Sequence, residues 1–136
     1  MKKFEATKLN SIDEVLSQAD FVSLHCPLTK ETKGLINKET ISKMKKSAYL
    51  INTARGDIVN ENDLVEALKE EMIMGAGLDV YEKEPSVHKN LVQLKNVFLL
   101  PHLGSATTET REAMGMRVFE NIQAFFNNKE PIDRVV

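Results

Sequence analysis

Short apolar runs alternate with amphipathic stretches along the chain. Four of the apolar runs have the length of buried strands, and they cover residues 21–26, 48–52, 75–80 and 96–100. In the stretches between them, apolar residues recur at the three- and four-residue spacing of a helix. This alternation is typical of βα units, in which helices link parallel strands. The pattern therefore predicts an α/β fold with about four parallel strands.

Residues that can cap helices stand at the beginning of the amphipathic stretches. Their side chains can accept hydrogen bonds from unpaired backbone amides, and the candidates are Ser11, Asn37, Asn60 and, for the last helix, Ser105 or Thr107. The first helix is expected to end near Gln18, the second near Met44 and the last at Asn127-Asn128. The last helix has an apolar stripe that is expected to face a core, formed by Met114, Val118, Phe119, Ile122, Phe125 and Phe126.

The composition limits the class of protein. A chain of 136 residues with 42% hydrophobic residues and a net charge of −2 has room for one globular domain with a core. Its mixed charge offers no basic surface to nucleic acid, and no apolar run is long enough to span a bilayer. The basic start Met1–Lys3 is not followed by the apolar segment of a signal peptide, and the single cysteine, Cys26, cannot form an internal disulfide. These features predict a cytoplasmic protein.

The glycines do not form a phosphate-binding fingerprint. A complete dinucleotide-binding fold begins with Gly-x-Gly-x-x-Gly between a strand and a helix, and the sequence contains no such turn. Gly75-Ala76-Gly77 stands at the start of a predicted strand instead of linking a strand to a helix, so we interpret its small residues as a place where a helix packs closely. The chain is therefore interpreted as the second half of a partial Rossmann-like, doubly wound sheet that lacks its Gly-rich first half.

Three residues follow successive predicted strands, and they are Arg55, Glu84 and His102. Loops after the carboxyl ends of parallel strands form ligand sites, so we expect the three side chains to meet at one edge of the sheet. A histidine can transfer protons near neutral pH. An arginine presents a planar fork of donors that suits a carboxylate. The three residues are interpreted as an acid/base pair with an anion clamp.

Five motifs, taken together, carry a family resemblance. They lie at residues 24–29, 34–37, 51–56, 77–81 with Glu84-Pro85, and 101–107. The chain resembles the D-isomer-specific 2-hydroxyacid dehydrogenases, a family that includes phosphoglycerate, glyoxylate/hydroxypyruvate and D-lactate dehydrogenases. The likeness covers essentially the whole chain. It implies that residues 1–136 are the C-terminal part of an NAD-binding domain, with residues near 127–136 leading back to an absent substrate domain.

The resemblance implies a role for each of the three residues. His102 resembles the general acid/base that exchanges a proton with the substrate oxygen while hydride moves to or from the nicotinamide. Glu84 resembles the carboxylate that hydrogen-bonds this imidazole and fixes its tautomer. Arg55 resembles the residue that holds the carboxylate and keto oxygen of a small 2-keto acid.

The resemblance also implies contacts with NAD, with NADP not excluded. Asp79 resembles the acid that accepts from the nicotinamide carboxamide, and the full set of implied cofactor positions is Cys26, Pro27, Thr53, Ala54, Arg55, Asp79, His102 and Gly104. No metal is expected, because the histidines lack ligand spacing and hydride transfer needs no metal.

Each residue has a plainer alternative. His102 alone would be a partly exposed hydrogen-bonding residue, Glu84 a solvated acid beside Glu82, and Arg55 a surface partner of Asp57. The whole chain also has an alternative, that of a truncated, non-enzymatic remnant or a nucleotide-sensing interaction module. Without the Gly-rich half, the chain alone is expected to be inactive and to bind NADH weakly. Its first strand would leave an open edge, so a homodimer or higher oligomer is expected.

Overall fold

The computed structural model describes residues 6–135. The basic start Met1–Lys3, interpreted above as unlike a signal peptide, lies outside the described residues. The chain divides into two compact units, the first ending at Pro101 and the second beginning at His102. Within residues 6–135, no helix combines the length and the apolar character needed to cross a membrane.

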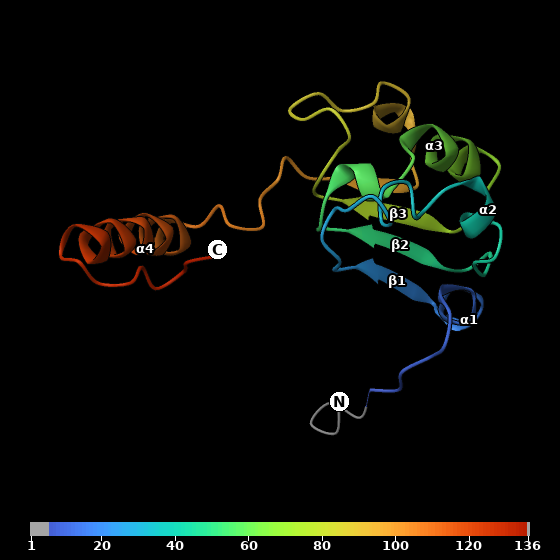
Figure 1. The fold of residues 1–136 in the computed structure, drawn as a ribbon. Helices are drawn as coiled ribbons and strands as arrows, with labels where there is room; N and C mark the ends of the chain where they lie inside the picture. The colour runs from blue at the N-terminus through green and yellow to red at the C-terminus, as the bar shows by residue number, and fades with distance from the viewer. Residues whose placement is uncertain (1–5, 136) are drawn as a thin grey trace. The chain divides into compact units, whose positions relative to one another are not determined.

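A parallel sheet forms the centre of the first unit (Figure 1). Its four strands lie side by side in chain order, and they are β1 (Phe21–Leu24), β2 (Tyr49–Asn52), β3 (Gly75–Leu78) and β4 (Val97–Leu99). All three neighbouring pairs are parallel. The predicted α/β fold with four parallel strands is confirmed, although each strand is shorter than its apolar run. The extra residues of the runs belong to the loops that flank the strands.

The helices of the first unit begin at their predicted caps. They are α1 (Ile12–Gln18), α2 (Lys38–Ile41) and α3 (Glu61–Lys69), with short 3-10 helices η2 (Gly56–Ile58) and η3 (Leu91–Gln93). Ser11, Asn37 and Asn60 each accept a backbone amide of the first turn. The prediction that the second helix runs through Met44 is wrong. After Ile41 the chain continues in tighter turns, in which Met44 N donates to Ile41 O.

One face of the sheet carries the hydrophobic core. Val22, Leu24 and Leu50 are buried there, against the apolar sides of α1, α2 and α3. Side chains of alternate residues point to the opposite face, where Phe21 and Phe98 are exposed. The first unit therefore places helices over one face of its sheet and leaves aromatic side chains on the other.

The glycines of β3 have a different role from the one expected. A Cβ atom on Gly75 would lie 3.1 Å from Cε1 of Tyr49, and one on Gly77 would lie 3.2 Å from Cδ1 of Ile51. A Cβ atom on Gly75 would also lie 2.7 Å from Asn96 O, so the backbone before β4 and the side chains of β2 both limit the space at this glycine. The interpretation that these small residues admit a helix is wrong, because they admit the larger side chains of the adjacent strand.

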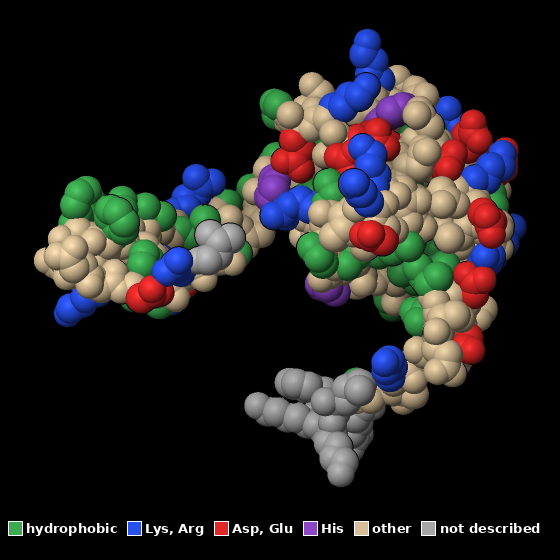
Figure 2. Space-filling model, in the orientation of Figure 1, with side chains coloured by type: hydrophobic (Ala, Val, Ile, Leu, Met, Phe, Trp, Pro, Cys, Tyr) green, Lys and Arg blue, Asp and Glu red, His purple; other side chains and the backbone are tan. Residues whose placement is uncertain are grey.

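The second unit is built on α4 (Thr108–Phe126). Thr107 caps it by accepting Thr110 N, and Asn128 follows it with the left-handed φ of 54° that asparagine tolerates. The predicted inward stripe is wrong for the described chain, since α4 buries none of its residues. The exposed stripe residues are part of the hydrophobic surface visible along this unit in Figure 2. Arg117 pairs with Asp133 at 2.7 Å and holds the segment after the helix against it.

Candidate cofactor and substrate site

The loops that follow β1 and β2 enclose an open pocket of about 630 Å³ at the carboxyl edge of the sheet. One wall is residues 25–28 and the other is residues 53–55. The structure therefore brings together five of the predicted site residues, which are Cys26, Pro27, Thr53, Ala54 and Arg55. Both walls are short loop segments at the carboxyl ends of neighbouring strands, which is the position where open α/β sheets bind their ligands.

Asn52 shapes the second wall of this pocket. Only 1% of the residue is exposed, and its side chain donates to Arg55 O at 3.0 Å and accepts Ala54 N at 3.1 Å. These two bonds fold the loop back on the strand end. Sequence reasoning gave Asn52 no role, although a polar residue that ends an apolar strand is a signal that could have identified it.

Arg55 projects from the folded loop with its side chain exposed. Its Nη1 donates to Ala54 O, and its other donors make no hydrogen bond with residues 6–135. Asp57, the alternative partner, pairs with Lys33 at 3.0 Å. The alternative that Arg55 serves as a surface partner of Asp57 is therefore wrong for the described chain.

The loops after β2 and β3 touch at Gly56. A Cβ atom there would lie 1.9 Å from the carbonyl carbon of Tyr81 and 2.4 Å from the amide nitrogen of Glu82. No side chain fits at such distances, so Gly56 is required for the close approach of the two backbones. The loop that carries Arg55 is thereby held against the loop that carries Glu84.

Two glutamates join the start of α3 to the loop after β3. The amide of Glu61 donates to Oε1 of Glu82, and the amide of Glu82 donates to Oε1 of Glu61, each at 2.9 Å. Glu61 is 6% exposed, and burial raises the pKa of its carboxyl, with backbone hydrogen bonding opposing the rise. Neither glutamate was predicted as a site residue, because the bonds join positions 21 residues apart and no local pattern indicates them.

Asp79 and Glu84 occupy different settings after β3. Asp79 is 5% exposed and its amide donates to Asn52 O, which extends the pairing of β2 with β3 by one residue. Glu84 is exposed, and its Oε1 accepts Tyr81 N at 3.1 Å. The loop thus orients the carboxylate of Glu84 while leaving it accessible.

His102 and Gly104 belong to the second unit. His102 has a φ of 56°, in the left-handed region that residues with side chains rarely adopt. Backbone of this kind occurs preferentially at functional sites. Glu84 lies in the first unit, so the pairing of Glu84 with His102 stays a prediction.

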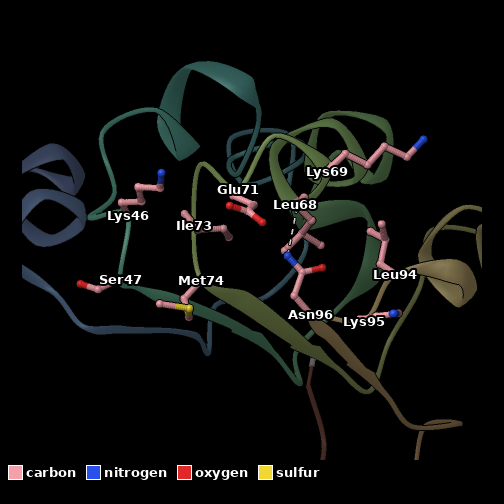
Figure 3. Close-up of a pocket in the computed structure, with 10 residues that line it drawn as sticks. All are labelled: Lys46, Ser47, Leu68, Lys69, Glu71, Ile73, Met74, Leu94, Lys95 and Asn96. Atoms are coloured by element: carbon pink, nitrogen blue, oxygen red, sulfur yellow. Dashed lines mark hydrogen bonds between the residues drawn. The ribbon is translucent and has the colours of Figure 1, made fainter.

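A larger cavity, of about 740 Å³, lies at the opposite edge of the sheet (Figure 3). Ser47, Met74 and Asn96 line it, and each stands just before one of the strands β2, β3 and β4. None of the predicted site residues lines this cavity. Within residues 6–135, no group of three or more His, Cys, Asp or Glu side chains is placed to hold a metal ion.

A parallel sheet with a pocket formed by the loops at its carboxyl edge places the first unit in the class of open-sheet α/β domains, which bind ligands at this edge. Comparison with known families is more specific. Residues 1–104 match the model of the D-isomer specific 2-hydroxyacid dehydrogenase, NAD binding domain, and the chain belongs to this family. The resemblance identified from the motifs is thereby confirmed.

Individual relatives agree with this assignment. The chain is 50% identical over 124 residues to a glyoxylate reductase of Thermococcus kodakarensis, a match that covers 91% of the chain and 37% of the relative. A solved protein from Thermus thermophilus is 46% identical with a TM-score of 0.89, covering 93% of this chain and 41% of that one. An NADPH-dependent glyoxylate/hydroxypyruvate reductase from Sinorhizobium meliloti, solved with NADP and malonate, is 38% identical with a TM-score of 0.87, covering 90% and 38%. The chain thus spans little more than a third of the length of the curated relatives that it matches.

Proposed function

We propose that this chain is the C-terminal part of the nucleotide-binding domain of an enzyme that interconverts small 2-keto acids and D-2-hydroxy acids with NAD or NADP. The observation that carries the proposal is the carboxyl-edge pocket, in which Arg55 stands beside Cys26, Pro27, Thr53 and Ala54. A cofactor in the pocket would therefore lie next to a cation suited to an acid substrate. The glyoxylate reductase relatives favour glyoxylate as the first substrate to test.

Arg55, His102 and Glu84 have different roles in the proposed reaction. When bound, the nicotinamide supplies or accepts the hydride at C2 of the substrate. Arg55 would hold the substrate carboxylate through its unused donors, which fixes the direction from which the carbonyl carbon is approached. His102 would give a proton to the carbonyl oxygen in reduction and take it back in oxidation. Glu84, oriented by Tyr81 N, would hold the imidazole in the required tautomer.

The proposed contacts with the cofactor come from the two walls of the pocket and from residues outside it. Cys26 and Pro27 would line the adenosine side, and Thr53, Ala54 and Gly104 would pass close to the nicotinamide. Asp79 would accept a hydrogen bond from the carboxamide. Because these positions are only part of a dinucleotide site, the 136-residue chain alone would be inactive and would bind NADH weakly.

The non-enzymatic alternative has less support. A nucleotide-sensing module needs the pocket but does not need an acid/base residue. The chain has His102 in a left-handed backbone conformation of the kind found at functional sites. We therefore favour the enzyme. A cytoplasmic location and a homodimeric or larger assembly belong to the same proposal.

The test is reduction of glyoxylate by NADH or NADPH, measured on the full-length product of the source gene. His102→Gln should lower kcat by roughly 10²-fold or more, the usual contribution of a positioned acid/base. His88→Gln is the matched control, since His88 contacts Asn62 and does not line the carboxyl-edge pocket. Turnover that is equal in the two variants would refute the role of His102. A wild-type protein without keto-acid reduction would refute the proposed function itself.

A further inference from the structure

Tyr81 contacts all three loop segments that lead to the proposed catalytic residues. Its amide donates to Oε1 of Glu84, and its carbonyl carbon lies against Gly56, the residue after Arg55. Its hydroxyl donates to Leu100 O at 2.7 Å, two residues before His102. Nothing in the proposed chemistry uses Tyr81 directly, and only 6% of it is exposed to solvent.

The hydroxyl bond continues the sheet beyond its last paired residues. The pairing of β3 with β4 ends at Leu78 and Leu99, after which Leu100 N donates to Leu78 O. The Tyr81 hydroxyl lies 2.7 Å from Leu100 O and 3.3 Å from Leu78 O, so its single proton is directed mainly to Leu100. The side chain thus bridges the ends of both strands.

Holding Leu100 O fixes the orientation of the peptide unit that joins Leu100 to Pro101. The carbonyl defines the plane of the peptide that joins Leu100 to Pro101, because peptide units are planar. Proline then restricts its own φ to about −65°. Only one freely rotating bond, ψ of Pro101, remains between this fixed plane and the nitrogen of His102.

The environment keeps the hydroxyl in its donating form. Burial raises the pKa of Tyr81, and the negative charge of Asp79 raises it further. The phenol is therefore protonated at neutral pH, and its donor is available to Leu100 O throughout the range in which a histidine titrates.

We propose that Tyr81 is a positioning residue that sets the place of His102 through Leu100 O while its backbone holds Glu84 and the Arg55 loop. This inference rests on the proposed function, because it assigns Tyr81 to the same reaction. It predicts that loss of the hydroxyl alone impairs proton transfer more than substrate binding. Arg55 and its loop are held through the Tyr81 backbone, which a change to phenylalanine leaves in place.

The test uses Tyr81→Phe, with Tyr49→Phe as the matched control. Tyr49 is the chain's other tyrosine, and its ring stacks on Phe21 at 5.4 Å instead of bridging strand ends. In the full-length gene product, Tyr81→Phe should lower kcat for glyoxylate about tenfold and change KM less than about twofold, while Tyr49→Phe should change neither. Equal kcat in Tyr81→Phe and wild type, or a fall matched by a similar rise in KM, would overturn the inference.

A second measurement does not depend on turnover. In the 136-residue chain, NMR signals of the His102 imidazole and of the Leu100 carbonyl carbon should shift in Tyr81→Phe and stay in place in Tyr49→Phe. Thermal unfolding of each variant shows that it is folded. If the full-length wild type does not reduce glyoxylate, the proposed function fails, and the NMR result still decides whether Tyr81 positions His102. Unchanged His102 signals in folded Tyr81→Phe would refute the positioning role.

Discussion

Glu61 and Glu82 each accept the other's backbone amide at 2.9 Å, which ties the start of α3 to the loop after β3. The arrangement places two carboxylates close together, one of them 6% exposed. Two charge-assisted hydrogen bonds stabilise the folded loop. Burial of the negative charge of Glu61 destabilises the folded state, because the carboxylate loses its hydration. The balance between these effects depends on pH.

Glu61→Gln should therefore stabilise the protein at neutral pH. Burial holds the pKa of Glu61 above its ordinary value of 4.5. Between that value and the pKa in the folded state, the folded protein therefore binds more protons than the unfolded protein. Stability contributed by this group is present below pH 4.5 and is lost as the pH rises through the folded pKa. Glutamine keeps the oxygen that accepts Glu82 N and carries no charge. The stability of the variant should therefore not fall as the pH rises through the pKa of Glu61.

Thermal unfolding between about pH 4 and 8 measures the effect. The melting temperature of Glu61→Gln should exceed that of wild type by about 2–4 °C near pH 7, and the difference should shrink toward pH 4.5. Glu112→Gln, at an exposed position of α4, is the control, and its melting temperature should equal that of wild type at each pH. A Glu61→Gln protein less stable than wild type at neutral pH would show that the charge strengthens the link more than burial weakens it.

Gly56→Ala should be strongly destabilising. Its new Cβ would lie 1.9 Å from the carbonyl carbon of Tyr81, and backbone on both sides leaves no flexible side chain to move aside. The expected loss is about 2–4 kcal/mol of unfolding free energy. Gly115→Ala is the control within the same chain, because Gly115 lies inside α4 with nothing within 4 Å of the added carbon.

Urea unfolding of the two variants gives the comparison. Gly115→Ala should raise the stability of the helix by about 0.5–1 kcal/mol, since alanine loses less backbone entropy than glycine on folding. A Gly56→Ala loss of less than about 1 kcal/mol would mean that the loops after β2 and β3 can separate without cost. In that case the link between the Arg55 and Glu84 loops would be weak.

Local patterns account for the parts of the fold that the sequence predicts well. Ser11, Asn37 and Asn60 cap helices through bonds within three residues, and such bonds can be anticipated from residue type and position. Apolar runs likewise identify the strands of the parallel sheet, although in β1 only alternate residues are buried. The carboxyl-edge placement of Thr53, Ala54 and Arg55 then follows from strand direction alone.

Contacts between distant segments account for what the sequence misses. The reciprocal bonds of Glu61 with Glu82 and the bond from Tyr81 to Leu100 O join residues that no periodicity relates. The requirement for glycine at position 56 depends on a neighbouring backbone that only the folded chain supplies. The predicted burial of the α4 stripe is wrong for a related reason. The helical spacing of residues such as Phe119 indicates an apolar face, but it does not identify the surface that would cover that face.

Arg55→Lys should weaken binding of the acid substrate. Lysine keeps the positive charge but lacks the planar fork that can bond a carboxylate through two nitrogens. Loss of one charge-assisted bond, worth about 1.5–3 kcal/mol, should raise KM for glyoxylate about tenfold to a hundredfold in the full-length gene product. Arg111→Lys on α4 is the control for the same chemical change at an exposed position. An unchanged KM in Arg55→Lys would remove Arg55 from the proposed substrate site.

Because β1 lies at the edge of the sheet, we expect the 136-residue chain to associate with itself. Within residues 6–135, β1 pairs only with β2, which leaves one row of backbone groups open to another strand. Tyr49 N donates to Asp20 O, and strand alternation then directs the amide of Ser23 away from β2, toward the open edge. Ser23→Pro would remove that outward donor without breaking the pairing of β1 with β2.

Sedimentation at several protein concentrations distinguishes an edge contact from a contact through the exposed sheet face. Wild type should be at least dimeric, and Ser23→Pro should shift the equilibrium toward monomer. Phe98→Ser, which changes a 68% exposed side chain on the face of the sheet, should leave the association unchanged. The opposite ranking of the two variants would mean that the aromatic face forms the contact, because burial of apolar area then drives association. A wild-type chain that stays monomeric at every concentration would contradict self-association through either surface.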